Sequence, residues 1–198
     1  MDEVDMLILA LKARTPGDRR RAAVKLGALG AAAEKAVPAL LDALADRDGD
    51  VRHYAGEAFG RLGKAAGNAV PGLVRDLISG VPAARNRAAH AIKKIGPAAA
   101  KAVPALVAAL ADPDAEFRRL AALALAGIGR TADKAVHALV PLLADEDVNV
   151  RWTATYALGA IGPKAKKAVP ALTKALRDEH PDVREGARVA IEKVQATS

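Results

Sequence analysis

The sequence lacks cysteine altogether and contains little serine and few aromatic residues. Without cysteine the chain cannot form a disulfide framework or a thiolate metal site, which fits a reducing compartment. The only serines are Ser79 and Ser198, and neither has a histidine and an acidic residue in a pattern typical of nucleophilic catalysis. Aromatic residues make up 3% of the chain, so the core must consist mainly of alanine, leucine, valine and isoleucine.

Long apolar runs and a basic leader are also missing. No apolar run approaches the roughly 20 residues that cross a bilayer. The first five residues, MDEVD, are acidic where a secretory signal peptide is basic. We therefore expect a cytoplasmic, monomeric protein without a membrane segment. The formal net charge of +7 is a modest excess of 30 basic over 23 acidic residues, so it keeps nucleic acid open as a partner without singling it out.

The chemistry-bearing residues form no enzymatic pattern. The four histidines show no HExxH or comparable metal-ligand spacing. The exposed acids Glu57 and Glu185 lie too far apart along the chain for paired acid–base work. No glycine-rich loop of the phosphate-binding kind is present. We expect no catalytic residue, no cofactor site and no metal site.

What the sequence does contain is a repeat with a period of 33 residues. A Val-Pro pair recurs at 37–38, 70–71, 103–104 and 169–170, with Val-His at 136–137. An arginine recurs at Arg19, Arg52, Arg85, Arg118, Arg151 and Arg184, and an alanine follows each one three residues later. Six units therefore fill the chain, at 1–33, 34–66, 67–99, 100–132, 133–165 and 166–198, and we expect a single repeat domain over residues 1–198.

Each unit carries two helical patterns. In the second unit, apolar residues at i, i+3, i+4 and i+7 predict a first helix over 37–44 and a second over 51–62. The proline of the Val-Pro pair falls in the first turn, where its missing N–H is not needed. Glycines at 30, 63, 96, 129 and 162 are positioned to end the second helices. No segment alternates with period two, so no strand is predicted.

These repeats resemble the HEAT-repeat family, in particular its short PBS-lyase HEAT-like branch. The segments GPAAAKAVPALVAALADPDAEFRRLAALALAGIG (96–129) and DEDVNVRWTATYALGAIG (145–162) carry the resemblance best, and it covers essentially all 198 residues. It implies an all-α fold, a right-handed α-solenoid of six helical hairpins whose second helices line the concave face. Ankyrin repeats share the period, but their TPLHxA signature is missing. A natural six-repeat module and an engineered HEAT-like binding scaffold both fit.

The resemblance also implies a structural role for the recurrent arginines. In the family, arginine and aspartate of neighbouring units commonly form a ladder inside the stack. The six recurrent arginines and Asp46, Asp112, Asp145 and Asp178 match this pattern, and Ser79 replaces the aspartate in repeat 3.

Three positions of the second helix, which lie one, two and five residues after the recurrent arginine, vary strongly between units while the stacking positions stay almost constant. The only tryptophan and both tyrosines of the chain fall at the varying positions, whereas Phe59 and Phe117 occupy stacking positions. Exposed tryptophan and tyrosine are typical of binding hot spots; neutral variation at solvated positions is the alternative. The predicted partner-binding residues are Trp152, Tyr156, Thr153, Arg119, Leu120, Leu123, Asn86, Arg87, His90, His53, Tyr54, Glu57, Arg20 and Arg21.

The sequence thus favours a non-enzymatic protein-binding scaffold that uses the concave face of the second helices. The alternative is a nucleic-acid-binding protein with a basic concave track of Arg20, Arg21, Arg87, Arg119 and Lys93. Such a track would bind phosphates with strong salt dependence, but two glutamates interrupt it. HEAT-like DNA glycosylases and phycobilin-type chromophore lyases also carry such repeats, and no residue here points to lyase chemistry.

Overall fold

The second helix of every repeat is a continuous α-helix of 14 or 15 residues. The structure is a computed structural model that describes residues 1–79 and 81–196, so Ser198 lies outside the described residues. The six second helices are α2 (Pro16–Leu29), α4 (Gly49–Leu62), α7 (Pro82–Ile95), α9 (Ala115–Ile128), α11 (Val148–Ile161) and α13 (Pro181–Gln195). Several begin at a capping side chain: Asp48, Asp114 and Asp147 each accept a hydrogen bond from a backbone N–H of the first turn.

Glycine ends the second helix in five repeats, as the sequence predicts. The five glycines at 30, 63, 96, 129 and 162 have φ between 54° and 69°, a backbone conformation that residues with a Cβ rarely adopt. These glycines therefore stop the helix and redirect the chain toward the next repeat.

The first helices are shorter. Five of them are α1 (Glu3–Ala10), α3 (Val37–Ala43), α6 (Val70–Leu77), α8 (Val103–Ala109) and α12 (Val169–Ala175). The proline of the Val-Pro pair lies in the first turn, as predicted. The sequence analysis did not anticipate the short helical turns that precede them: η1 (Gly30–Ala36), α5 (Lys64–Gly67), η2 (Gly96–Ala102), η3 (Gly129–Ala135) and η5 (Gly162–Ala168).

The first helix of repeat 5 is broken, which the periodicity did not predict. It consists of α10 (Val136–Leu139) and a separate 3₁₀ turn, η4 (Pro141–Ala144). Pro141 has no N–H to donate to the preceding turn and its ring crowds that turn, so the α-helix ends before it.

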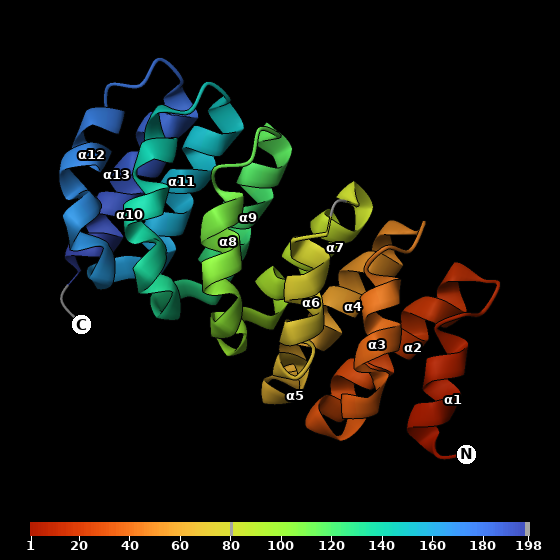
Figure 1. Ribbon diagram of the computed structural model, residues 1–198. Coiled ribbons are helices and arrows are strands. Elements are labelled where there is room, and N and C mark those ends of the chain that lie inside the picture. The colour runs from red at the N-terminus through yellow and green to blue at the C-terminus, as the bar shows by residue number, and fades with distance from the viewer. Residues whose placement is uncertain (80, 197–198) are drawn as a thin grey trace. The chain divides into compact units, whose positions relative to one another are not determined.

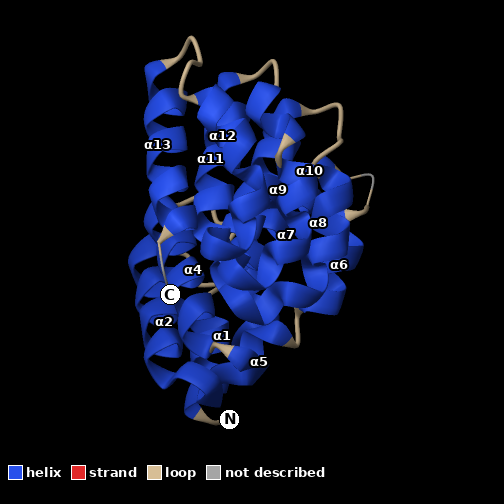
Figure 2. Ribbon diagram, turned by 90° about the vertical axis from the view of Figure 1, so that its left-hand side faces the viewer, coloured by secondary structure: helices blue, strands red, loops and turns tan. Residues whose placement is uncertain are grey.

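The chain divides into two compact units, residues 1–98 and 99–198. In the first unit α4 packs against α2 and α7; in the second, α11 packs between α9 and α13 (Figure 1). All described elements are helical, with no strand among residues 1–79 and 81–196 (Figure 2). The fold class is all-α, an α-solenoid of repeated helical hairpins. A single repeat domain over the whole chain stays a prediction.

Small residues allow the second helices to pack closely. The six recurrent alanines, at 22, 55, 88, 121, 154 and 187, are all buried. Phe59 and Phe117 are buried too, which confirms that they belong to the core. Because a methyl group takes little room, neighbouring helix backbones can approach each other at the alanine positions.

The arginine–aspartate ladder is present within both units. Arg19 binds Asp46, Arg118 binds Asp145 and Arg151 binds Asp178, each through two N–H···O hydrogen bonds of 2.7–3.1 Å. Each arginine also donates to two carbonyl oxygens of the turn before its own helix. The hydrogen bond from Arg19 holds the pKa of Asp46 below its ordinary value. These paired, largely buried side chains link one repeat to the next.

Arg52 shows what happens where the aspartate is replaced. The residue 27 positions after it is Ser79, and within residues 1–79 and 81–196 the hydrogen bonds of the Arg52 side chain go to the carbonyl oxygens of Asp46 (2.7 Å) and Arg47 (3.1 Å). The arginine thus fixes the turn of its own repeat even without a carboxylate from the next one.

Candidate functional site

Trp152 and Tyr156 form a stacked aromatic pair on the surface of α11. They are one helical turn apart, so their side chains project from the same face. The ring centroids are 5.7 Å apart and the ring planes differ by 5°. Both remain accessible, with 40% of Trp152 and 45% of Tyr156 exposed. The prediction that these aromatics lie at exposed positions is confirmed.

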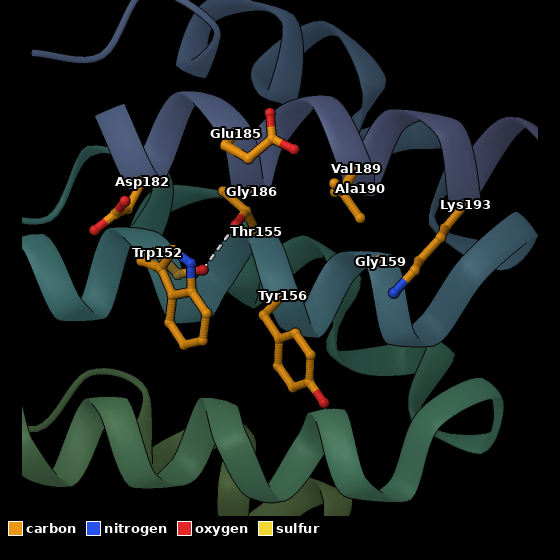
Figure 3. A pocket seen from close by; sticks show the side chains of 10 residues that line it. All are labelled: Trp152, Thr155, Tyr156, Gly159, Asp182, Glu185, Gly186, Val189, Ala190 and Lys193. Carbon is orange, nitrogen blue, oxygen red and sulfur yellow. Dashed lines mark hydrogen bonds between the residues drawn. The ribbon is translucent and has the colours of Figure 1, made fainter. Parts of the chain in front are cut away.

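A groove of about 320 Å³ lies beside this pair, between α11 and α13 (Figure 3). It is lined by Trp152, Thr155, Tyr156, Gly159, Asp182, Glu185, Gly186, Val189, Ala190 and Lys193. The lining is mostly apolar or backbone, with ionised groups confined to α13. The site therefore combines an aromatic surface with a charged edge on a neighbouring helix.

Two glycines bring α11 and α13 together at the groove. A Cβ on Gly186 would overlap the hydroxyl oxygen of Thr155, and a Cβ on Gly159 would lie 3.2 Å from the Cα of Ala190. Thr155 itself is fixed because its hydroxyl donates a 2.7 Å hydrogen bond to the carbonyl oxygen of Trp152 (dashed in Figure 3). The groove is therefore shaped by packed helices rather than by a loop.

The ionised groups on α13 are arranged by sign. Asp182 lies in the first turn of the helix, Glu185 one turn further along and Lys193 near the end, and Figure 3 shows Asp182 and Lys193 at opposite sides of the groove. Eleven residues of α-helix separate Asp182 from Lys193, which is roughly 16 Å along the axis. The groove thus has an acidic end and a basic end.

The two carboxylates differ in how far they are neutralised. Glu185 accepts hydrogen bonds of 2.6 and 2.9 Å from Arg188, and these lower the pKa of the Glu185 carboxyl. The ion-pair partner of Asp182 among the described residues is the imidazole of His180, 3.7 Å away. Since an imidazole carries a full charge only when protonated, Asp182 leaves negative charge at this end of the groove.

The aromatic pair and the groove together are suited to binding. Within the described residues no three histidine, cysteine, aspartate or glutamate side chains are grouped as a metal ion would require. The search of the described helices for a segment long and apolar enough to span a membrane found none. An accessible aromatic pair beside a preformed groove is what an interface anchor needs.

The predicted site residues differ in how far their side chains are exposed to solvent. Those on the surface, besides the aromatic pair, are Arg20, Arg21, His53, Tyr54, Glu57 and His90. Those that are half-buried are Asn86, Arg87 and Arg119.

Three predicted contact residues are buried instead, which corrects the sequence-based patch. Leu120 is 2%, Leu123 9% and Thr153 0% exposed. Thr153 follows Trp152 and Leu120 follows Arg119, and the rotation of about 100° per helix residue turns these shorter side chains toward the packed side. The longer side chains of Arg21 and Tyr54 have the same register and still reach the surface. Leu123 has the register of Tyr156, but its shorter side chain stays covered.

The predicted contact residues His53 and Tyr54 lie on α4 in the first unit. His53 and Tyr54 meet edge to face with ring centroids 5.2 Å apart. They line a smaller hollow of about 200 Å³ between α2 and α4, together with Val24, Glu57 and Arg61. The groove on α11 and α13 is therefore the more favourable candidate.

The arginines of the proposed basic track all have carboxylate partners. The pairs are Arg20 with Asp50 (3.3 Å), Arg21 with Asp18, Arg87 with Asp76 (3.8 Å) and Arg119 with Glu116 (2.6 Å). Since each partner offsets one positive charge, the track presents a weaker field to a phosphate backbone than its sequence indicates.

The sequence analysis missed the α13 side of the groove, in particular Asp182, Gly186 and Lys193. The sequence does contain a signal for Asp182 and Lys193. Relative to Glu185, Asp182 lies at i−3, Val189 at i+4 and Lys193 at i+8, so all four residues share one helix face. The depth of the groove at Gly186 depends on Thr155 of the preceding repeat, and this contact has no periodic signature.

Comparisons with known proteins agree with this architecture. The sequence pattern of the family described as HEAT repeats matches residues 37–126 and 103–192, and that of the PBS lyase HEAT-like repeat matches residues 18–46. None of the curated proteins matches the chain.

Solved structures of similar fold include engineered and natural repeat proteins. One engineered protein is 29% identical over 98% of this chain and 97% of its own, with a TM-score of 0.61. A designed armadillo repeat protein in complex with the peptide (KR)4 is 20% identical over 98% of this chain and all of its own, with a TM-score of 0.61. The complex of CpcE and CpcF of phycocyanin lyase from Nostoc sp. PCC7120 contains a chain that is 22% identical over 79% of this chain and 98% of its own, with a TM-score of 0.63.

Proposed function

The chain belongs to the HEAT-repeat family, and we propose that it is a non-enzymatic protein-binding scaffold that uses the face formed by the second helices of its repeats. The observation that carries the proposal is the exposed Trp152–Tyr156 pair beside the groove between α11 and α13. Both side chains are large, and packing against each other holds them in place before a partner arrives, so little ordering entropy is lost on binding.

The choice of residues supports binding over neutral variation. The chain has one tryptophan and two tyrosines, and all three lie on exposed positions of second helices. Aromatic side chains placed side by side next to a groove offer a partner apolar area that isolated surface aromatics do not. Proteins of the same fold include a designed scaffold bound to a peptide and a subunit of a two-protein complex, which is in keeping with a protein partner.

Nucleic acid is the weaker alternative, and it makes a different prediction. The arginines that would contact phosphates are paired with carboxylates, and the groove itself carries Asp182 and Glu185. Binding through the basic track would fall steeply with salt and would not depend on the aromatic pair.

The decisive experiment is a pull-down from a cell lysate, with and without nuclease treatment, with the parent chain and the double variant Trp152→Ala/Tyr156→Ala. Leu176→Ala is the matched control, because Leu176 is a 37% exposed apolar residue of the same unit outside the groove. Circular dichroism of each chain checks that the variants are folded. Retained proteins are identified by mass spectrometry and then titrated individually, with the emission of Trp152 as a local probe.

We expect one protein to be retained by the parent and the Leu176 control and to be lost with the double variant. Retention that is equal in all three chains would contradict the proposed site. Retention that disappears with nuclease and moderate salt, whatever the variant, would establish nucleic acid binding instead.

A further inference from the structure

We propose that the groove between α11 and α13 binds an extended peptide segment of the partner that carries an arginine at one end and an acidic residue at the other. The inference rests on the proposed function and adds the chemistry of what is bound. It is drawn from the aromatic pair, from the two carboxylates at one end of the groove and from Lys193 at the other end.

The acidic end is suited to arginine in particular. A guanidinium is planar, so it can stack on an indole or phenol ring and at the same time donate hydrogen bonds to a carboxylate. Trp152 and Tyr156 supply two nearly parallel rings, and Asp182 and Glu185 line the same groove. Asp182 faces only an imidazole as an ion-pair partner within the described residues, so a permanent cation at this end finds an incompletely neutralised carboxylate.

The basic end sets the length of the segment. Lys193 forms no ion pair with another described residue, and its side chain packs close to Gly159, which leaves its ammonium group at the end of the groove. The roughly 16 Å between Asp182 and Lys193 corresponds to about five residues of extended chain at about 3.3 Å each. The bound segment therefore has its arginine and its acidic residue about five positions apart.

The middle of the groove selects apolar side chains. Val189 and Ala190 line the groove beside the aromatic pair, and the absence of a side chain at Gly186 lets α13 lie against Thr155 of α11. One or two apolar residues between the charged ends of the peptide would cover this lining. Phosphate groups are disfavoured at the same place because the carboxylates repel them.

The test begins with a displayed library of random twelve-residue peptides selected on the parent chain. Enriched peptides are synthesised twice, once as found and once with arginine replaced by citrulline, which keeps the shape of the side chain and removes its charge. Both are titrated by isothermal calorimetry against the parent, against Asp182→Asn/Glu185→Gln and against Trp152→Ala/Tyr156→Ala. The exposed carboxylate variants alter no core contact, and circular dichroism verifies the fold of all three chains.

We expect the enriched peptides to share an arginine and an acidic residue about five positions apart. Citrulline should weaken binding to the parent about tenfold, which is the size of one charge-assisted, partly desolvated contact. The same replacement should change the affinity for Asp182→Asn/Glu185→Gln less than twofold, because the charge has lost its partners. Lys193→Gln should weaken binding of the peptides only where their acidic residue is present.

The outcomes separate this inference from the function on which it rests. Peptides that need the aromatic pair but bind equally well with citrulline would overturn the arginine proposal and leave the binding face intact. Peptides that are insensitive to Trp152→Ala/Tyr156→Ala, or a library without any binder, would overturn both.

Discussion

Adding a single methyl group at Gly186 tests the packing that forms the groove. In a helix interior, alanine is ordinarily more stable than glycine by about 0.5–1 kcal/mol because it restricts the unfolded chain. At Gly186 the new Cβ would overlap the hydroxyl oxygen of Thr155 and lie 3.5 Å from an indole carbon of Trp152. Overpacking of this kind costs about 1–3 kcal/mol. We therefore expect Gly186→Ala to destabilise the chain by about 1 kcal/mol.

Gly60→Ala is the matched control. Gly60 is also a helical glycine, but a Cβ there would meet nothing closer than the carbonyl oxygen of Lys94 at 3.7 Å, an ordinary contact. With no overlap, the alanine should stabilise its unit by about 0.5–1 kcal/mol. The two substitutions are thus chemically identical and are expected to act with opposite signs.

The contact responsible is identified by a double-mutant cycle with Thr155→Ala. Removing the threonine hydroxyl makes room for the methyl group, so Gly186→Ala should stabilise the Thr155→Ala chain by the ordinary 0.5–1 kcal/mol. The coupling energy between the two positions is then about 1–3 kcal/mol, well above the roughly 0.5 kcal/mol error of additivity.

Urea denaturation gives the measurement, with circular dichroism for both units and the emission of Trp152, the only tryptophan, for the second unit. A loss of about 1 kcal/mol corresponds to a midpoint lower by roughly 0.5 M urea. If Gly186→Ala stabilises as much as Gly60→Ala, or if the cycle is additive, α13 does not approach α11 at Gly186 and the account of the groove is wrong.

Three further predictions concern the core and the ladder. Ala121→Leu places a larger side chain at a fully buried position and should cost about 1–3 kcal/mol; an unchanged urea midpoint would show that the position is not tightly packed. Thr153→Val removes a buried hydroxyl that has no hydrogen-bond partner in the described structure, so it should stabilise by about 1 kcal/mol, and a lower midpoint would mean that the hydroxyl is bonded. The lowered pKa of Asp46 means that its pairing with Arg19 stabilises the fold above the unfolded pKa of about 3.9 and is lost as the pH falls through the lower folded value. Asp46→Asn should therefore flatten the fall in unfolding free energy below about pH 4, and an identical pH profile would refute this.

The repeat itself was predictable because its signals are local and recur. A glycine at the end of the second helix, such as Gly63, stops that helix in five repeats, and a proline marks the first turn of the first helix in four. The Arg19–Asp46 pair was expected from the resemblance to HEAT repeats, and it agrees with the rule that a charge repeated beside an apolar stripe has a partner. Four copies of the Val-Pro pair, five of the glycine and six of the arginine reinforce one another, which a single occurrence would not.

The repeat period did not predict the broken helix at Pro141 or the burial of Leu120 and Thr153. Pro141 is a single departure inside a periodic pattern, so the repeat period hides it. Leu120 and Thr153 were placed on the binding face because their positions vary between units, yet both are buried. Variation at a position shows that the stack tolerates different side chains there; it does not show that the side chain reaches solvent.

The groove results from two residues that depart from the repeat pattern and that contact each other, Thr155 and Gly186. The four preceding repeats have only alanine or glycine in the register of Thr155, as Ala89 and Ala122 do, whereas four of the five other repeats have a side chain of leucine size or larger in the register of Gly186. A larger residue on α11 thus meets the smallest residue on α13, and the hydroxyl occupies the place where a Cβ would lie. Independent drift at the two positions gives no reason for this match in volume. A requirement to keep α13 close to α11 beside Trp152 accounts for both residues at once.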